Sequence, residues 1–148
     1  MSRSYSAIKA GVIGWPIAHS LSPHLHGHWL QDYQIDGTYE PFAVEPEEVS
    51  DFLQSLPDRE LAGVNVTLPH KVAVLDAVDE ADDVARRIGA VNTIVVREDG
   101  SLQGSNTDAF GFIENISDVQ PGWDAKAGPA VVLGAGGAAR AVCVALQD

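Results

Sequence analysis

The sequence of 148 residues has little sulfur and little positive charge: it contains one cysteine, one methionine and nine Lys+Arg against 21 Asp+Glu. The single cysteine, Cys143, excludes an intrachain disulfide and is typical of proteins from a reducing compartment. A formal net charge of -12 argues against nucleic acid or an anionic membrane as a partner, because no basic stripe is present to neutralise phosphates. The acid excess by itself indicates only a well-solvated surface.

Long apolar runs are absent as well. The N-terminal stretch begins with a basic flank, but Lys9, Gly11, Gly14 and Pro16 interrupt its apolar residues, so we expect no signal peptide. No segment approaches the roughly 18 apolar residues of a membrane span. Heptads, internal repeats and low-complexity tracts are lacking too, whereas 45% of the residues are hydrophobic. We therefore expect a globular protein of the cytoplasm.

Short β-branched runs alternate with helical patterns from Ala10 onward, which is typical of an α/β fold with a mainly parallel sheet and helices on both faces. The segment Glu98-Asp99-Gly100 separates two short runs and predicts a hairpin, so the sheet should be mixed. Pro41 favours an edge position for its strand, and Ser22 before Pro23 predicts a helix N-cap. The expected strands are 10–14, 38–44, 63–67, 91–97, 101–104 and 130–133, and the expected helices are 22–34, 46–56, 69–78, 80–88, 108–116 and 138–148.

Glycines stand between the apolar run 130–133 and the helical pattern that follows it. Gly134, Gly136 and Ala139 have the spacing of a dinucleotide-binding fingerprint with alanine at its third position. Such a turn lets the backbone approach a pyrophosphate, and the following helix N-terminus offers free N–H groups. An ordinary tight strand-to-helix turn is the alternative, but the place directly after an apolar strand favours a cofactor loop.

A domain boundary is expected in residues 117–129, the longest segment without apolar periodicity, which contains two prolines and two glycines. We predict a domain at 1–120, a linker at 121–129 and a second unit at 130–148. A full βαβ unit needs about 30 residues or more, so the second unit is expected to be the incomplete start of a Rossmann domain. The apolar faces of its strand and helix should then lack covering partners.

Polar side chains follow several expected strands, at the edge of an α/β sheet where ligands bind. Ser20 and Ser22 come after the first strand, and neutral hydroxyl donors suit a carboxylate or hydroxyl ligand, although Ser22 also has a sufficient role as an N-cap. Asn65 and Thr67 alternate with apolar residues in the strand 63–67, where a buried amide needs a partner.

A lysine and an acid complete this set of polar residues. Lys71 lies one turn into the expected helix 69–78 among apolar neighbours; a solvated surface lysine is the alternative. Asn106 and Asp108 start the helix 108–116, where Asp108 could serve only the helix dipole. His24 and His28 share a helix face, but no Glu or Cys stands at companion spacing, so no metal site is expected.

The chain resembles the shikimate dehydrogenases in five ordered segments: GVIGWPIAHSLSPHLH, GVNVTLPHK, IGAVNT, GSNTDAFGF and VVLGAGGAAR. These enzymes reduce 3-dehydroshikimate to shikimate with NADPH in the aromatic amino-acid pathway, and the resemblance covers residues 10–148. Quinate/shikimate dehydrogenases and aminoshikimate dehydrogenases share most of these segments and remain alternatives.

The resemblance implies roles for individual residues. Ser20 and Ser22 would hold the substrate carboxylate, and Lys71 would act as acid or base at the reacting oxygen, oriented by Asp108; which of the two moves the proton stays open. The substrate hydroxyls would be bound by Asn65, Thr67, Asn92 and Asp108. The pyrophosphate of NADP would be bound by Gly134, Ala135, Gly136, Gly137 and Ala138, and Asp83 matches a position that reaches the cofactor in some members.

The leading hypothesis is therefore an NADP-dependent oxidoreductase acting on a CH–OH group, with shikimate and 3-dehydroshikimate as small-molecule partners. The 148-residue chain is expected to be inactive alone because its cofactor-binding unit is incomplete, and to be a monomer or homodimer. The alternative is a non-catalytic module that binds a shikimate-like hydroxy acid. The sequence leaves open the preference between NADP and NAD and any quinate activity.

Overall fold

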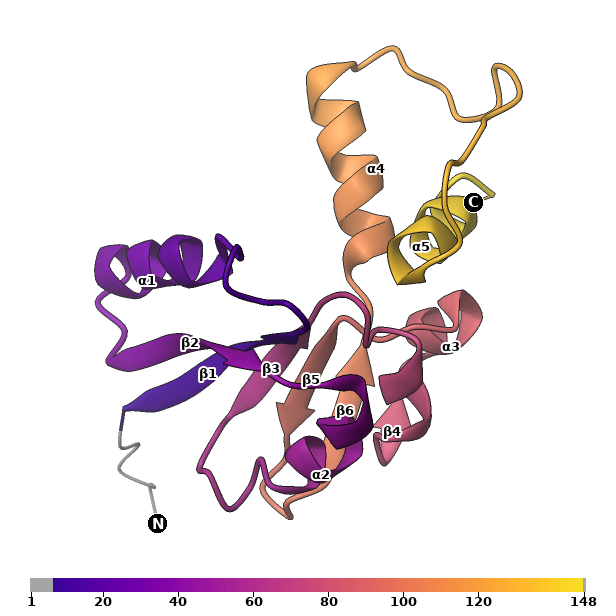
Figure 1. Ribbon diagram of the computed structural model, residues 1–148. Coiled ribbons are helices and arrows are strands. Elements are labelled where there is room, and N and C mark those ends of the chain that lie inside the picture. The colour runs from indigo at the N-terminus through magenta and orange to yellow at the C-terminus, as the bar shows by residue number, and fades with distance from the viewer. Residues whose placement is uncertain (1–6, 148) are drawn as a thin grey trace.

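The computed structural model describes residues 7–147; the basic N-terminal flank (1–6) and Asp148 lie outside the described part. Within it, one mixed sheet has the strand order β2-β1-β3-β5-β6-β4 (Figure 1). The three strands β2, β1 and β3 are parallel, β4 is parallel to β6, and β5 runs antiparallel to both of its neighbours. The strands are β1 (Ile8–Gly14), β2 (Gly37–Ala43), β3 (Gly63–Val66), β4 (Glu80–Ala81), β5 (Thr93–Val96) and β6 (Leu102–Ser105).

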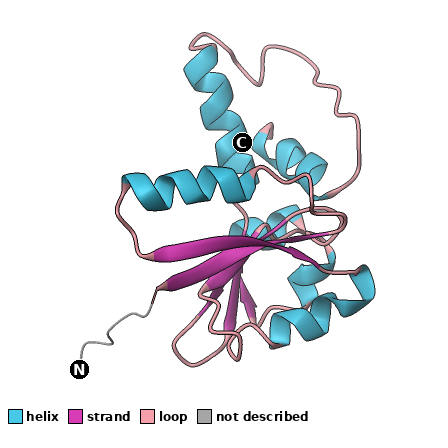
Figure 2. Cartoon of the chain, turned by 60° about the vertical axis from the view of Figure 1, so that its left-hand side comes forward, coloured by secondary structure: helices cyan, strands magenta, loops and turns pink. Residues whose placement is uncertain are grey.

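Helices lie on both faces of this sheet, as the sequence predicts. Helix α1 lies along one face, whereas α2 lies on the opposite face (Figure 2). Helix α4 rises away from the end of β6, and α5 packs beside it. The helices are α1 (Ser22–Asp32), α2 (Val49–Gln54), α3 (Asp83–Ile88), α4 (Asp108–Val119) and α5 (Gly137–Ala145), with 3₁₀ turns η1 (Pro46–Glu48) and η2 (Ala73–Asp76).

The main hydrophobic core lies on the α2 face of the sheet. Ile13 of β1, Leu53 of α2 and Ile94 of β5 are almost fully buried there. Phe42 of β2 packs against Phe52 of α2 with ring centroids 5.4 Å apart. The core thus fixes the sheet. A second, smaller cluster fixes the helices at one end of the sheet by joining α3, α4 and α5 through the buried residues Ile88, Ala109, Ala141 and Ala145.

The predicted helix over residues 69–78 is wrong, because only the 3₁₀ turn η2 forms there. In an α-helix the carbonyl of Lys71 would accept a hydrogen bond from the N–H of Leu75. Instead it accepts one from Val91, at 2.7 Å, and Leu75 donates to Val72. A hydrogen bond to a distant segment therefore replaces a local one, and Lys71 lies on an irregular loop after β3.

The predicted strand over residues 130–133 is also wrong, because this segment has no regular secondary structure. A strand needs a neighbouring strand to share its backbone hydrogen bonds, and none pairs with this segment among the described residues. Val131 is 85% and Leu133 94% exposed, as expected for apolar side chains without covering partners. For the following helix α5 the expectation of an uncovered apolar face is wrong, because Ala141 and Ala145 are buried against α3 and α4.

Gly63→Ala tests the close pairing of β3 with β5. A Cβ atom at Gly63 would overlap the carbonyl oxygen of Ile94, a backbone atom that moves only if the strands separate. We expect this substitution to lower the free energy of unfolding by about 2 kcal/mol, measured by urea denaturation. Gly27→Ala in α1 is the control, because an added Cβ there has no atom within 4 Å; it should stabilise by about 0.5–1 kcal/mol. Equal stability of the two variants would contradict this explanation.

Candidate active site

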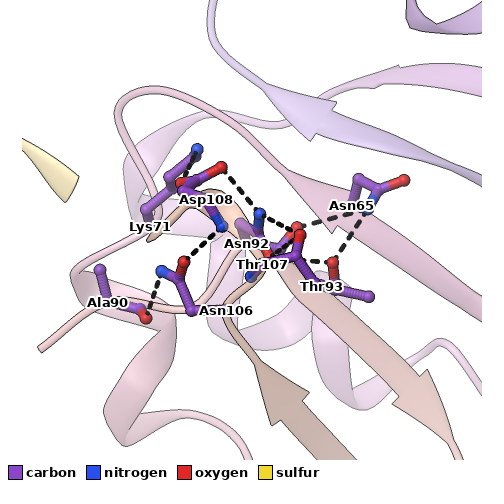
Figure 3. Close-up of polar contacts among 8 residues, drawn as sticks. All are labelled: Asn65, Lys71, Ala90, Asn92, Thr93, Asn106, Thr107 and Asp108. Carbon is purple, nitrogen blue, oxygen red and sulfur yellow. Dashed lines mark hydrogen bonds and ion pairs between the residues drawn. The ribbon is translucent and has the colours of Figure 1, made fainter. Parts of the chain in front are cut away.

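Polar residues from three strands meet at one edge of the sheet. Strands β3 and β6 end at this edge, and β5 begins there because it runs antiparallel to both. Lys71 lies on the loop after β3, Asn92 directly precedes β5, and Asp108 begins α4 after β6 (Figure 3). The reversal of β5 therefore brings residue 92, which stands before its strand, to the same place as residues that follow theirs.

Lys71 and Asp108 form the centre of this site. The lysine Nζ donates a hydrogen bond to Oδ2 of Asp108 at 2.6 Å. The side chains are 18% and 27% exposed, so the ion pair is shielded from water yet reachable from one side. This placement excludes the surface-lysine alternative for Lys71, and Asp108 faces the lysine in addition to lying in the first turn of α4.

Two asparagines hold Asp108 in place (Figure 3). The Asn92 amide donates to Oδ1 of Asp108 at 2.8 Å and to Oγ1 of Thr107 at 3.0 Å. Its oxygen accepts hydrogen bonds from the Thr107 N–H at 3.1 Å and from the hydroxyl of Thr93 at 2.9 Å. Asn106, only 5% exposed, donates to the carbonyl of Ala90 and accepts from the Asp108 N–H, both at 2.9 Å. The start of α4 is thereby fixed by side chains from the β6–α4 and α3–β5 connections.

Asn65 and Thr67 differ in how they are engaged. Asn65 donates to Oγ1 of Thr93 at 3.1 Å and accepts from the hydroxyl of Tyr39 at 2.6 Å. Thr67 lies just beyond β3, with its backbone N–H bonded to the carbonyl of Ile13, and its hydroxyl has no hydrogen bond within the described chain. Thr67 therefore keeps a free donor and acceptor at the edge, whereas Asn65 belongs to a network within the sheet.

The two predicted serines lie on the loop that follows β1. Ser20 accepts a hydrogen bond from the backbone N–H of Ser22 at 3.3 Å. The prediction of Ser22 as N-cap is wrong: Leu21 occupies that position without a side-chain cap, and Ser22 is the first residue of α1. This loop is tied to the one after β3, since Trp15 N–H donates to the carbonyl of Leu68 at 3.1 Å. The serines share the sheet edge with Lys71, but within residues 7–147 no hydrogen bond joins them to the Lys71–Asp108 pair.

The glycine loop approaches the same site from α5. A Cβ atom on Gly137 would lie 2.8 Å from Cβ of Lys71, so only glycine allows this close approach. Gly134 has a φ of 133°, which favours glycine, and Gly136 is the N-cap of α5 without any side-chain cap. Asp83 stands apart, exposed in the first turn of α3.

The histidines do not form a metal site among residues 7–147: no group of three His, Cys, Asp or Glu side chains there could hold an ion. His70 is only 2% exposed, and its Nε2 is 2.9 Å from the carbonyl of Val44, so this nitrogen carries a proton and donates it. His70 therefore ties the loop after β3 to the loop after β2.

An aromatic cluster that sequence patterns did not reveal packs α1 onto β2. The rings of His26 and Tyr39 stack with centroids 3.9 Å apart and planes 2° from parallel, and Trp29 meets His26 edge-on at 5.2 Å. Burial raises the pKa of Tyr39 to about 12 and lowers the pKa of His26. Both rings are thus kept neutral at physiological pH.

The raised pKa of Tyr39 predicts a delayed ionisation at alkaline pH. The chain has three tyrosines, and in an ultraviolet titration by rapid pH jumps we expect one of them to ionise only near pH 12. The pKa of Tyr39 in the folded chain lies above the ordinary value of 10, so the contribution of the neutral phenol to the free energy of unfolding is fully present below pH 10. This contribution is lost as the pH rises through about 12. Tyr39→Phe should abolish the late phase, and a late phase that persists in this variant would contradict the assignment.

The fold and the site together define an α/β domain that carries a lysine–carboxylate ion pair at the edge of its sheet. A profile of the family described as shikimate dehydrogenase substrate binding domain matches residues 12–94. The chain belongs to this family.

Full-length relatives extend the comparison. Shikimate dehydrogenase (NADP(+)) of Paramagnetospirillum magneticum is 58% identical over 145 residues, which cover 98% of this chain and 52% of the relative. The enzyme of the same name from Rhodospirillum rubrum is 61% identical over 139 residues, covering 94% and 49%. A crystal structure of shikimate 5-dehydrogenase from Thermus thermophilus in complex with NADP(H) and shikimate has a TM-score of 0.84 and 44% identity, covering 95% of this chain and 52% of that one. The chain spans about half the length of the curated relatives it matches.

Proposed function

We propose that the chain supplies the substrate-binding and acid–base part of an NADP-dependent shikimate dehydrogenase, which reversibly reduces 3-dehydroshikimate to shikimate in aromatic amino-acid biosynthesis. The observation that carries this proposal is the Lys71–Asp108 pair, 2.6 Å apart at the sheet edge where β3 and β6 end. Relatives named for this activity align over almost the whole chain. We propose the cytoplasm as its compartment, from the single cysteine.

Lys71 is proposed to move the proton. Oxidation of an alcohol removes a hydride from carbon and a proton from the hydroxyl oxygen, and a positioned side chain lowers the barrier by carrying that proton. In the reverse direction the Lys71 ammonium donates a proton to the oxygen of the ketone as negative charge develops on it. Asp108 fixes the lysine through its Oδ2 and leaves part of its carboxylate open to a substrate hydroxyl.

The remaining substrate contacts are proposed for residues around this pair. Ser20 and Ser22 would bind the carboxylate of shikimate as neutral hydroxyl donors, and the free hydroxyl of Thr67 would bind a ring hydroxyl. Asn65 retains a lone pair on its oxygen for such a contact. Asn92 is fully hydrogen-bonded, so it binds substrate only by exchanging one partner, for which Thr107 is the most exposed choice.

The glycine loop is proposed to bind the pyrophosphate of NADP through Gly134, Ala135, Gly136, Gly137 and Ala138. The first N–H groups of a helix lack intrahelical acceptors, and α5 begins at glycines with no side chain over its end. A Cβ atom on Gly136 would have no atom within 4 Å, so this part of the loop has open space in which a phosphate group can approach the backbone. The cofactor, when bound, accepts or supplies the hydride. Asp83 is proposed as a further cofactor contact on the α3 side.

This assignment divides the chain as the sequence predicts. We propose residues 1–120 as the shikimate-binding domain, 121–129 as a linker and 130–148 as the first part of a dinucleotide-binding domain. No helix in residues 7–147 is both long and apolar enough to cross a membrane. A monomer or homodimer is the proposed assembly.

Calorimetry and a turnover assay test the proposal together. Shikimate should bind the 148-residue chain, and its methyl ester should bind more weakly because the carboxylate charge is lost. The enzyme in the form its gene encodes should oxidise shikimate with NADP, followed at the nicotinamide absorbance band, and quinate assayed beside shikimate decides the substrate range. Binding without turnover would support a non-catalytic module instead. The proposal would be overturned if the chain did not bind shikimate and the gene-encoded enzyme did not oxidise it.

A further inference from the structure

A chain of hydrogen bonds crosses the sheet on the face covered by α1 and ends at Asp108. Its first member, Tyr39, lies on the edge strand β2 and donates to the side-chain oxygen of Asn65 on β3 at 2.6 Å. The strand between them, β1, places the small side chain of Ala10 opposite Tyr39 and Val12 opposite Asn65, and the phenol reaches across β1 on this face. Tyr39 is held in this pose by the stacked ring of His26.

The next bonds continue in the same direction toward the active site (Figure 3). Asn65 donates to Oγ1 of Thr93, its register partner on β5, at 3.1 Å. The Thr93 hydroxyl donates to the oxygen of Asn92 at 2.9 Å, and the Asn92 amide donates to Oδ1 of Asp108 at 2.8 Å. Asn65, Thr93 and Asn92 each accept from the member before and donate to the member after, so successive bonds polarise and strengthen one another.

We propose that Tyr39 is a positioning residue for the reaction and that it acts on Asp108 through Asn65, Thr93 and Asn92. This inference rests on the proposed function, since it assigns Asp108 its part in the reaction. The relay supplies one of the two donors that hold the Asn92 amide: its oxygen accepts from the Thr93 hydroxyl and from the Thr107 N–H, so the amide nitrogen points at the carboxylate. Helix α1 is thereby connected to the acid–base pair from the edge of the sheet.

The relay predicts that removing the hydroxyl of Tyr39 impairs the positioning of Asp108 and therefore the reaction. Tyr39→Phe keeps the stacked ring and removes only the hydroxyl, and we expect kcat/KM for shikimate oxidation by the gene-encoded enzyme to fall about 2- to 10-fold. Thr93→Val should lower kcat/KM by a similar factor. Thr93→Ser keeps the hydroxyl, so its kcat/KM should equal that of the wild type. Tyr33→Phe is the matched control, because Tyr33 is 74% exposed at the end of α1 and its hydroxyl has no partner within residues 7–147.

A double variant separates a relay from independent packing effects. If Tyr39 and Thr93 act through one chain of bonds, Tyr39→Phe should cause no further loss in the Thr93→Val background. Losses that add in full, or a Thr93→Ser variant as impaired as Thr93→Val, would overturn the proposal.

Nuclear magnetic resonance of the unliganded 148-residue chain keeps this inference distinct from the proposed function. Tyr39→Phe should shift the side-chain amide signals of both Asn65 and Asn92, and Tyr33→Phe should shift neither. If the Asn92 signals move but no shikimate turnover exists, the relay stands and the proposed function fails. If only the Asn65 signals move while shikimate is oxidised normally, the relay is wrong and the proposed function stands.

Discussion

Replacing Lys71 with methionine in the gene-encoded enzyme is expected to lower kcat for the proposed oxidation of shikimate by about 10³-fold. Methionine has nearly the length of the lysine stem, so packing against Gly137 is kept while both the ammonium charge and its proton are lost. The loss should fall mainly on kcat, because a proton carrier contributes most in the transition state. Shikimate affinity, measured by calorimetry, should fall about tenfold or less.

Two further variants show whether this loss reports proton transfer. Lys9→Met is the matched control: Lys9, near the start of β1, forms a solvent-exposed ion pair with Glu60 at 2.9 Å, and its removal should leave kcat unchanged. In Lys71→Ala, added methylammonium should restore part of the activity, since a small amine fits the space left by the side chain. A Lys71→Met enzyme with more than about a tenth of wild-type kcat would show that another group carries the proton.

Much of the fold follows from local sequence patterns. The hairpin at Asp99-Gly100, the edge position of the strand with Pro41 and the helix end at Gly89 are all as predicted. Each of these depends on the backbone freedom of one or two residues, which the sequence displays directly. The predictions that fail are the helix 69–78, the strand 130–133 and the first residues of the helix 80–88, where β4 forms instead and pairs with β6. In each of them a distant partner is taken up or lacking.

The candidate site divides in the same way. Lys71 and Asp108 stand after strands, and the rule that ligands bind at carboxyl ends of strands makes them candidates, although the sequence alone leaves a surface lysine and a helix-dipole acid as alternatives. Asn92 stands before its strand, and only the resemblance points to it. The predicted hairpin could have placed Asn92 at the site: because β5 runs antiparallel to β6, the start of β5 lies where β6 ends.

No sequence pattern reveals the relay from Tyr39. An aromatic residue on an edge strand is typical of β-structure, and nothing local distinguishes it from a packing residue. Its partner Asn65 is 26 positions away and lies two strands over, so their meeting depends on the register of three strands. Register is a property of the folded sheet.

Asp108→Asn should affect substrate affinity more, and kcat less, than we expect for Lys71→Met. We expect shikimate affinity of the 148-residue chain to fall about 10- to 100-fold, because the open part of the carboxylate is lost as an acceptor for a substrate hydroxyl. The substitution also disturbs its neighbours: Lys71 and the Asn92 amide both donate to this side chain, at 2.6 and 2.8 Å. An asparagine has one oxygen, so one of these donors must face its NH₂ group and move away.

The comparison of the two variants decides which member of the pair moves the proton. If Asp108 only orients Lys71 and binds substrate, Asp108→Asn should lower kcat by about 10- to 100-fold, which is less than the fall expected for Lys71→Met. The same substitution should lower shikimate affinity more than Lys71→Met does. The matched control is Asp51→Asn, an exposed acid in the first turn of α2 whose loss should change neither quantity. A larger fall in kcat for Asp108→Asn than for Lys71→Met would make Asp108 the proton carrier, because an amide can neither take up the proton nor support the ammonium beside it.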